Sequence, residues 1–165
     1  MPKNILIIIL FVVLLVAGGF WFIKKHYSST APVVLPPWYS ETDANGDPVV
    51  GVFENKLPCY EPGCEKIKFA LVFYQKPGAK YPTSYRMDRI YVAKGDDRTV
   101  NEGTLTATHG MKLYPEAVLY HLDDHVPQEF RSFWVVSPDV LFILDEAGNP
   151  RVGNAAYGYA LNRTR

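Results

Sequence analysis

The residues best suited to chemistry are the only two cysteines of this 165-residue chain, Cys59 and Cys64. They flank Pro62-Gly63, a dipeptide that turns a chain back and can bring two Cβ atoms within the ~3.5–4.5 Å that a disulfide needs. A disulfide requires an oxidising compartment, which favours the periplasm or another extracytoplasmic side. Two alternatives stay open: a redox or sensing pair, and thiolate ligands for copper or zinc.

Histidines are the candidate partners of the cysteines in such a metal site. His121 and His125 form H-x-x-x-H, which on a helix puts both on one face, but here they stand where a strand is expected to end. The alternative is two solvent-exposed imidazoles beside acidic residues, and His109 stands alone. The candidate copper or zinc ligands are Cys59, Cys64, His109, His121 and His125; no other cofactor is expected.

No catalytic motif emerges from the sequence, and we expect no enzyme. A G-x-S-x-G nucleophile elbow and a P-loop are both absent. No spacing pairs two carboxylates for acid–base work, and Arg86, Asp88 and Arg89 are interpreted as a solvated face with cross-strand pairs. Trp134 and the pair Tyr157/Tyr159 are candidates for lining a ligand cavity, or else for filling a core.

Short strands must position these side chains, because apolar and polar residues alternate with a period of two after Val49. Turn signals such as Lys76-Pro77-Gly78 and Ser137-Pro138-Asp139 separate the runs. The pattern predicts an all-β domain, an antiparallel meander of about eight strands closed into a barrel. The expected strands are Val49–Leu57, Ile67–Phe73, Thr83–Ala93, Gly103–Thr108, Ala117–Leu122, Phe130–Val136, Val140–Leu144 and Ala155–Leu161.

One transmembrane helix is expected before this domain. Asn4 to Ile23 is an uncharged apolar run of about 20 residues, the length that spans a bilayer. It exceeds the ~7–15 residues of a signal-peptide core, so we interpret it as an uncleaved signal-anchor. The flanking lysines are balanced and leave the orientation open. The expected organisation is a transmembrane helix over 1–25, a Pro-rich linker over 26–48 and a β domain over 49–165.

The charge balance disfavours nucleic-acid binding. Lys plus Arg and Asp plus Glu both total 17, so the formal net charge is zero. Electrostatic binding of DNA or RNA needs a basic face that neutralises phosphates. The expected partners are the membrane, through residues 4–23, and an envelope protein.

With the Leu57-Pro58-Cys59 segment followed by Cys64, and with a hairpin that contains Leu144-Asp145 and Gly148-Asn149, the β domain resembles the N-terminal domain of the copper-resistance lipoprotein NlpE and its relatives. The likeness covers roughly residues 49–163, and its most specific pieces are the Leu-Pro-Cys opening and the Leu-Asp…Gly-Asn hairpin. The corresponding segments are Gly51-Val52-Phe53, Leu57-Pro58-Cys59 with Cys64, Ile67 to Phe73, Tyr91, Leu141 to Pro150, and Tyr157 to Leu161.

The resemblance implies a small β-barrel distantly like a lipocalin, facing the periplasm and linked to envelope stress or copper tolerance. The chain departs from the family in its C-x4-C spacing, where C-x-x-C is usual, and in having an apolar segment instead of a lipidated cysteine.

Three functions follow from these observations. The first is a non-enzymatic periplasmic binding module, anchored in the bacterial inner membrane, in an envelope stress or copper response or in a membrane protein assembly. The second is a lipocalin-like carrier of a small apolar ligand, which predicts a cavity of ~300 Å³ or more. The third is a copper- or zinc-binding protein that uses the cysteine pair.

Overall fold

The structure is a computed structural model that describes residues 38–165. Within this range no helix is long and apolar enough to cross a membrane. The predicted transmembrane helix over 4–23 lies outside the described residues, as does the larger part of the predicted linker.

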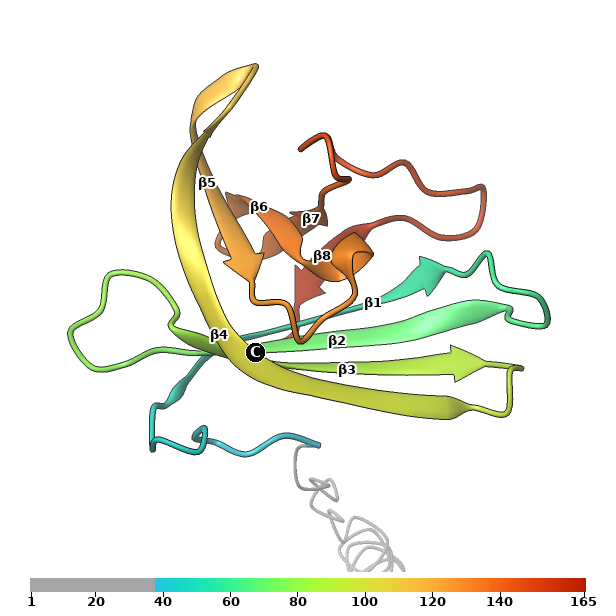
Figure 1. Cartoon of the computed structure of the whole chain (residues 1–165), viewed down its shortest axis with the longest axis horizontal. Helices are drawn as coiled ribbons and strands as arrows, with labels where there is room; N and C mark the ends of the chain where they lie inside the picture. The colour runs from blue at the N-terminus through green and yellow to red at the C-terminus, as the bar shows by residue number, and fades with distance from the viewer. Residues whose placement is uncertain (1–37) are drawn as a thin grey trace, which may run out of the picture. The chain divides into compact units, whose positions relative to one another are not determined.

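Eight antiparallel strands close into a barrel in which each strand pairs with its neighbours in the sequence, and β1 pairs with β8. The predicted all-β meander barrel is therefore confirmed. Figure 1 shows the closed arrangement. The strands are β1 (Val49–Pro58), β2 (Lys66–Tyr74), β3 (Ser84–Val92), β4 (Asp97–Met111), β5 (Tyr114–Leu122), β6 (Ser132–Ser137), β7 (Val140–Ile143) and β8 (Ala160–Arg163), with one 3-10 turn, η1 (Gln128–Phe130), before β6.

Alternation along β2 explains how the barrel interior is filled. Ile67, Phe69, Leu71 and Phe73 all point inward and are at most 5% exposed. Successive side chains of a strand point to opposite faces, so the residues between them face outward. Large residues from the other strands complete this core, among them Phe53, Tyr85, Met87, Phe133, Leu141 and Tyr159.

Four strands, β4, β5, β6 and β8, differ from their predicted bounds by two residues or more, and β5 begins at Tyr114 where Ala117 was predicted. β4 runs from Asp97 to Met111, much longer than the predicted Gly103–Thr108. Its first half pairs with β3 and its second half with β5, and the yellow ribbon in Figure 1 shows this long strand bending between them. Phe130 belongs to the 3-10 turn η1, so β6 begins later than predicted.

The last strand, β8, is short and closes the barrel between β7 and β1. β8 begins at Ala160, whereas the sequence predicted a strand from Ala155. The Asn154 side chain accepts hydrogen bonds from the backbone N–H groups of Ala156 and Tyr157, which holds the chain in a turn before β8. β8 then pairs with β1 at two positions and with β7 at three.

Trp38 and Tyr39, which the sequence assigned to the linker, pack against the outside of the barrel. They pack against Val52, Val72 and Tyr74, which are outward-facing residues of β1 and β2. Val72 is fully buried and Tyr39 only 9% exposed. Residues 38–48, assigned to the linker from their prolines and polar residues, are therefore part of the domain, because they cover apolar side chains that the barrel leaves on its outside.

Asp43 fixes the turn within this segment. Its carboxylate accepts hydrogen bonds from the backbone N–H groups of Asn45 and Asp47, at 2.8 and 2.9 Å, and from the Ser84 hydroxyl at 2.6 Å. Partial burial raises the pKa of Asp43, but these hydrogen bonds lower it by more, and the net pKa lies below its usual value. The segment is thus tied to β3 by a charged group as well as by apolar packing.

Candidate functional site

The two cysteines form a disulfide, with the sulfur atoms 2.04 Å apart and the Cα atoms 5.8 Å apart. They close the loop between β1 and β2, where Gly63 adopts φ of +77°, a conformation that glycine reaches without a steric penalty. The Cys64 N–H donates to the Glu61 carbonyl and completes the turn. The disulfide interpretation is confirmed, and in this state neither sulfur is a thiolate that could hold copper or zinc.

The structure does not bring the three candidate histidines together. His109 Nε2 lies 2.8 Å from the Tyr81 hydroxyl, and His121 lies between Thr108 and Ser132 on the outer face of β5. His125 is exposed, with Nδ1 3.5 Å from Asp123. Among residues 38–165, no cluster of three or more His, Cys, Asp or Glu side chains has the arrangement of a metal site.

The three candidate aromatic ligand residues also lie apart. Trp134 stacks on Tyr114, with ring centroids 5.0 Å apart. Tyr159 is buried in the barrel core, and the Arg151 guanidinium lies 4.4 Å from its ring centroid. Tyr157 is half-buried, and its hydroxyl donates to Glu65 at 3.4 Å. These residues fill or flank the core and do not line a common cavity.

Two charged residues of β3 are buried, contrary to the expectation of a solvated face. Asp88 is 5% exposed and Arg89 is 3% exposed. Arg89 points into the barrel, where it donates to the Tyr91 hydroxyl and to the Asn101 side chain, and its guanidinium lies 5.2 Å from the Phe130 ring centroid. Asp88 points the other way, onto the outer face of the sheet. The alternation of residue types in the sequence did not show which other residues cover Asp88 and Arg89.

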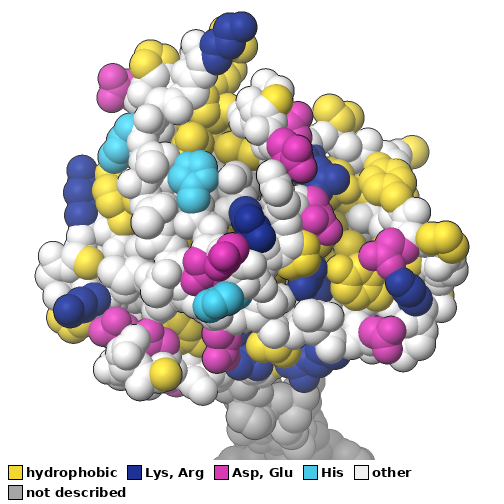
Figure 2. Space-filling view, viewed as in Figure 1, with side chains coloured by type: hydrophobic (Ala, Val, Ile, Leu, Met, Phe, Trp, Pro, Cys, Tyr) yellow, Lys and Arg dark blue, Asp and Glu magenta, His cyan; other side chains and the backbone are white. Residues whose placement is uncertain are grey.

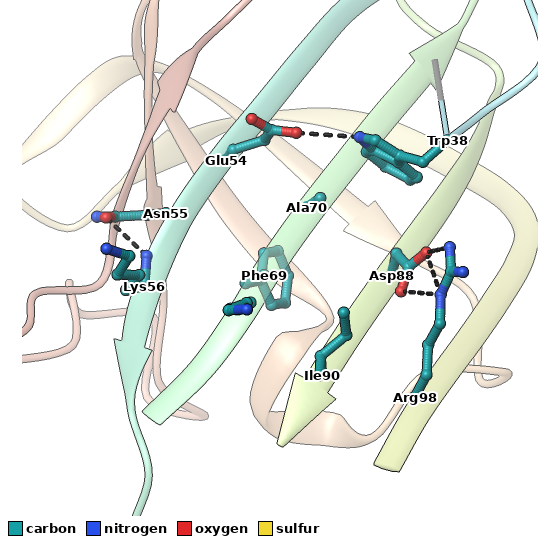
Figure 3. A pocket seen from close by; sticks show the side chains of 10 residues that line it. Trp38, Glu54, Asn55, Lys56, Phe69, Ala70, Asp88, Ile90 and Arg98 are labelled. Carbon is teal, nitrogen blue, oxygen red and sulfur yellow. Dashed lines mark hydrogen bonds and ion pairs between the residues drawn. The ribbon is translucent and has the colours of Figure 1, made fainter. Parts of the chain in front are cut away.

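A hollow lies on the outer face of β1–β4, and we call it the outer groove. Its volume is about 620 Å³. Figure 3 shows its walls: the Trp38 indole over one side, and side chains from β1 to β4 along the rest. The lining residues are Trp38, Glu54, Asn55, Lys56, Lys68, Phe69, Ala70, Asp88, Ile90 and Arg98.

Strand register explains how these residues meet. Lys56 on β1 lies opposite Lys68 on β2, which lies opposite Ile90 on β3, which lies opposite Arg98 on β4. We call this line of four residues the basic row. The neighbouring row holds Glu54, Ala70 and Asp88 in the same order. The outer groove therefore has an apolar floor of small and branched side chains between charged ends.

Both carboxylates of the outer groove already have partners. Glu54 accepts a hydrogen bond from the Trp38 indole N–H at 3.1 Å. Arg98 grips Asp88 through Nε, at 3.0 and 2.9 Å from the two carboxylate oxygens, and through Nη2. The hydrogen bonds with Asp88 raise the pKa of Arg98. A buried carboxylate needs such a partner, because burying an unpaired charge is costly.

The two lysines of the basic row have no such partner. Among residues 38–165, neither Lys56 nor Lys68 has a carboxylate oxygen within 4.0 Å. Both are exposed and face the same side of the sheet. Like charges directly opposite each other on neighbouring strands repel. This end of the outer groove therefore attracts an anion.

Sequence reasoning missed the outer groove almost entirely. A signal for one part was present: a hairpin centred near Pro62 places Lys56 opposite Lys68. The rest depends on the register of β3 and β4 and on the packing of Trp38 over the barrel, which no local pattern specifies.

Charged side chains elsewhere are mixed in sign. Figure 2 shows Lys and Arg interspersed with Asp and Glu over the face in view, without a broad patch of one sign. The zero net charge of the chain is thus accompanied by an even mixture of positive and negative side chains on that face. No family model matches the chain, and comparisons with curated proteins and with solved structures found no match.

Proposed function

We propose that the chain is a non-enzymatic binding module, anchored in the bacterial inner membrane, which holds a component of the cell envelope in its outer groove. Three features support this: the apolar run over 4–23, a disulfide that needs an oxidising compartment, and a groove outside the barrel. The β domain then lies in the periplasm. Participation in envelope stress signalling, in copper tolerance or in a membrane protein assembly follows from the NlpE resemblance.

The observation that carries this proposal is the location of the free volume. Apolar side chains fill the barrel interior, whereas about 620 Å³ lies outside, over the broad sheet of β1–β4. That volume is within the ~300–1,000 Å³ typical of ligand sites. A groove open along a sheet accepts part of a larger molecule, such as an envelope protein or a membrane lipid.

A small apolar ligand is the second candidate. The hollow that touches the core measures about 170 Å³ and lies between Phe53, Phe73, Tyr120 and the loops after β2 and β6. This is smaller than the ~300 Å³ expected of a carrier. A carrier function would therefore also use the outer groove rather than the barrel interior.

Photo-crosslinking in intact cells tests the proposal. A photoreactive amino acid replaces Ile90 in the full-length chain, and a matched variant carries it at Val136, an exposed aliphatic residue away from the groove. We expect adducts with an envelope protein or a membrane lipid from position 90 and not from position 136, identified by mass spectrometry. Identical adducts from both positions, or none from position 90, would refute the proposal.

A further inference from the structure

The charges that line the outer groove and the place of Trp38 in the chain narrow the chemical class of the ligand. We propose that the outer groove binds an anionic phospholipid, whose phosphate lies between Lys56 and Lys68 and whose acyl chain lies over Ala70 and Ile90. This inference rests on the proposed function and names the envelope component that the groove takes.

The charge argument starts from the basic row. Lys56 and Lys68 lie directly opposite each other, and neither has a carboxylate oxygen of the described chain within 4.0 Å, so an added anion relieves their repulsion. Arg98 adds a third positive group, whose Nη1 is not part of the Asp88 ion pair. Arg98 pairs with Asp88 and the Trp38 indole donates to Glu54, so the two lysines outnumber the one carboxylate of the groove that has no basic partner.

The apolar part of the outer groove fits an acyl chain. Ala70 and Ile90, which lies within the basic row, form the floor, and the Trp38 indole forms a wall. Trp side chains with an apolar body and one polar N–H favour the boundary between headgroups and hydrocarbon. An anionic head against the two lysines and an apolar tail over the floor between the charged residues therefore match this groove.

The position of Trp38 supports a membrane source. It lies in the segment that precedes β1 and itself lines the groove. The apolar run that we propose as the anchor ends at Ile23, so a short stretch of chain separates the bilayer from this residue. A membrane anchor in the same chain raises the effective concentration of lipid around the groove.

Lipid titration of the full-length protein tests the inference. The purified chain in a non-ionic detergent is titrated with phosphatidylglycerol or with phosphatidylcholine, and bound lipid is counted by native mass spectrometry. We expect tighter binding of phosphatidylglycerol. The variant Lys56→Gln/Lys68→Gln should weaken that binding roughly tenfold or more and leave phosphatidylcholine binding unchanged.

The control removes the same charge elsewhere. Lys76→Gln/Lys112→Gln changes two exposed lysines that do not line the outer groove and should retain phosphatidylglycerol binding. Thermal melts verify that all variants are folded. Equal binding of the two lipids, or equal losses in the two double variants, would overturn the inference.

The inference and the proposed function fail in different ways. If position 90 crosslinks only to an envelope protein and phosphatidylglycerol shows no preference, the groove is a protein-binding site and the lipid inference is wrong. If position 90 crosslinks to nothing and neither lipid binds, the lipid inference and the proposed function are both wrong. Lipid adducts at position 90 that disappear in Lys56→Gln/Lys68→Gln support both.

Discussion

Gly103 lies where β4 leaves β3 and joins β5. It pairs with Tyr85 on β3, and the β5 register begins two residues later at Leu105. Asp123 approaches this glycine closely: it accepts hydrogen bonds from the Thr104 N–H at 2.6 Å and from the Tyr85 hydroxyl at 2.7 Å. A Cβ at position 103 would overlap the Asp123 carboxylate. The absence of a side chain at Gly103 therefore lets the Asp123 carboxylate, which follows β5, accept hydrogen bonds from both β3 and β4.

We expect Gly103→Ala to lower the free energy of unfolding by about 1–3 kcal/mol, because the added methyl displaces Asp123 from its hydrogen bonds. Gly158→Ala is the matched control, since a Cβ there meets no atom within 4 Å. Urea denaturation followed by tryptophan fluorescence measures both. Equal stability of the two variants would show that Asp123 does not need this close approach.

At the scale of elements, residues 38–48 act as a cover for the outer face of β1 and β2. Tyr39 packs on Val52 and Val72, and its hydroxyl accepts a hydrogen bond from Arg165 at 3.2 Å. Arg165 also pairs with Glu41 at 2.8 Å, and its carbonyl accepts from the Val52 N–H at 3.0 Å. The segment thus fastens the C-terminal residues to β1, and its first residue, Trp38, completes the outer groove.

Tyr39→Ala should destabilise the protein by about 2–4 kcal/mol, because it uncovers Val52 and Val72 and removes a large buried ring. Tyr60→Ala deletes the same side chain at a site that is 70% exposed, and should change stability by no more than ~0.5 kcal/mol. Thermal and urea denaturation of the full-length chain compare the two. A small effect of Tyr39→Ala would mean that residues 38–48 do not belong to the cooperative unit.

The strands differ in how accurately their bounds could be predicted from the sequence. Strands such as β2 were predicted closely because large apolar residues that face the core recur at every second position. The first half of β4, from Asp97 to Glu102, was missed because its side chains are mostly exposed on both faces and carry no apolar alternation. β8 was placed too early because Tyr157 and Tyr159 continue the alternation of a strand through what is a turn.

The candidate site was predicted less well than the fold, for a related reason. The disulfide could be anticipated because both cysteines flank a local turn. The outer groove is built from outward-facing residues of four strands and from Trp38, so it depends on register and on the packing of a segment that looks like a linker. The proposed metal and aromatic residues were chosen by type, and the barrel distributes them over separate faces.

At the scale of the whole molecule, stability should depend on pH through hydrogen-bonded carboxylates. For Asp123, partial burial raises the pKa, but hydrogen bonds from Tyr85 and Thr104 lower it by more, and the net pKa lies below its usual value, as it does for Asp43. A carboxyl group whose pKa is lower in the folded state stabilises the fold above its unfolded pKa. That stabilisation is lost as the pH falls through the folded pKa.

We therefore expect the free energy of unfolding to be nearly constant above pH ~5 and to fall below pH ~4. The variant Asp43→Asn/Asp123→Asn should be less stable at neutral pH and show a shallower acid dependence. Chemical denaturation at a series of pH values measures both slopes. An unchanged slope in the double variant would assign the acid sensitivity to other carboxylates.

The short β8 makes the closure between β7 and β1 the most weakly paired part of the barrel, and we call it the seam. Because two residue pairs join it to β1 and three join it to β7, this strand holds the ring closed with far less pairing than β1 shares with β2. Amide hydrogen exchange should therefore be fastest, among the strands, at Leu161 and Asn162. Opening at the seam frees the flanks of β1 and β7 for the β8 of a second copy, so concentrated protein should form strand-exchanged dimers before it unfolds.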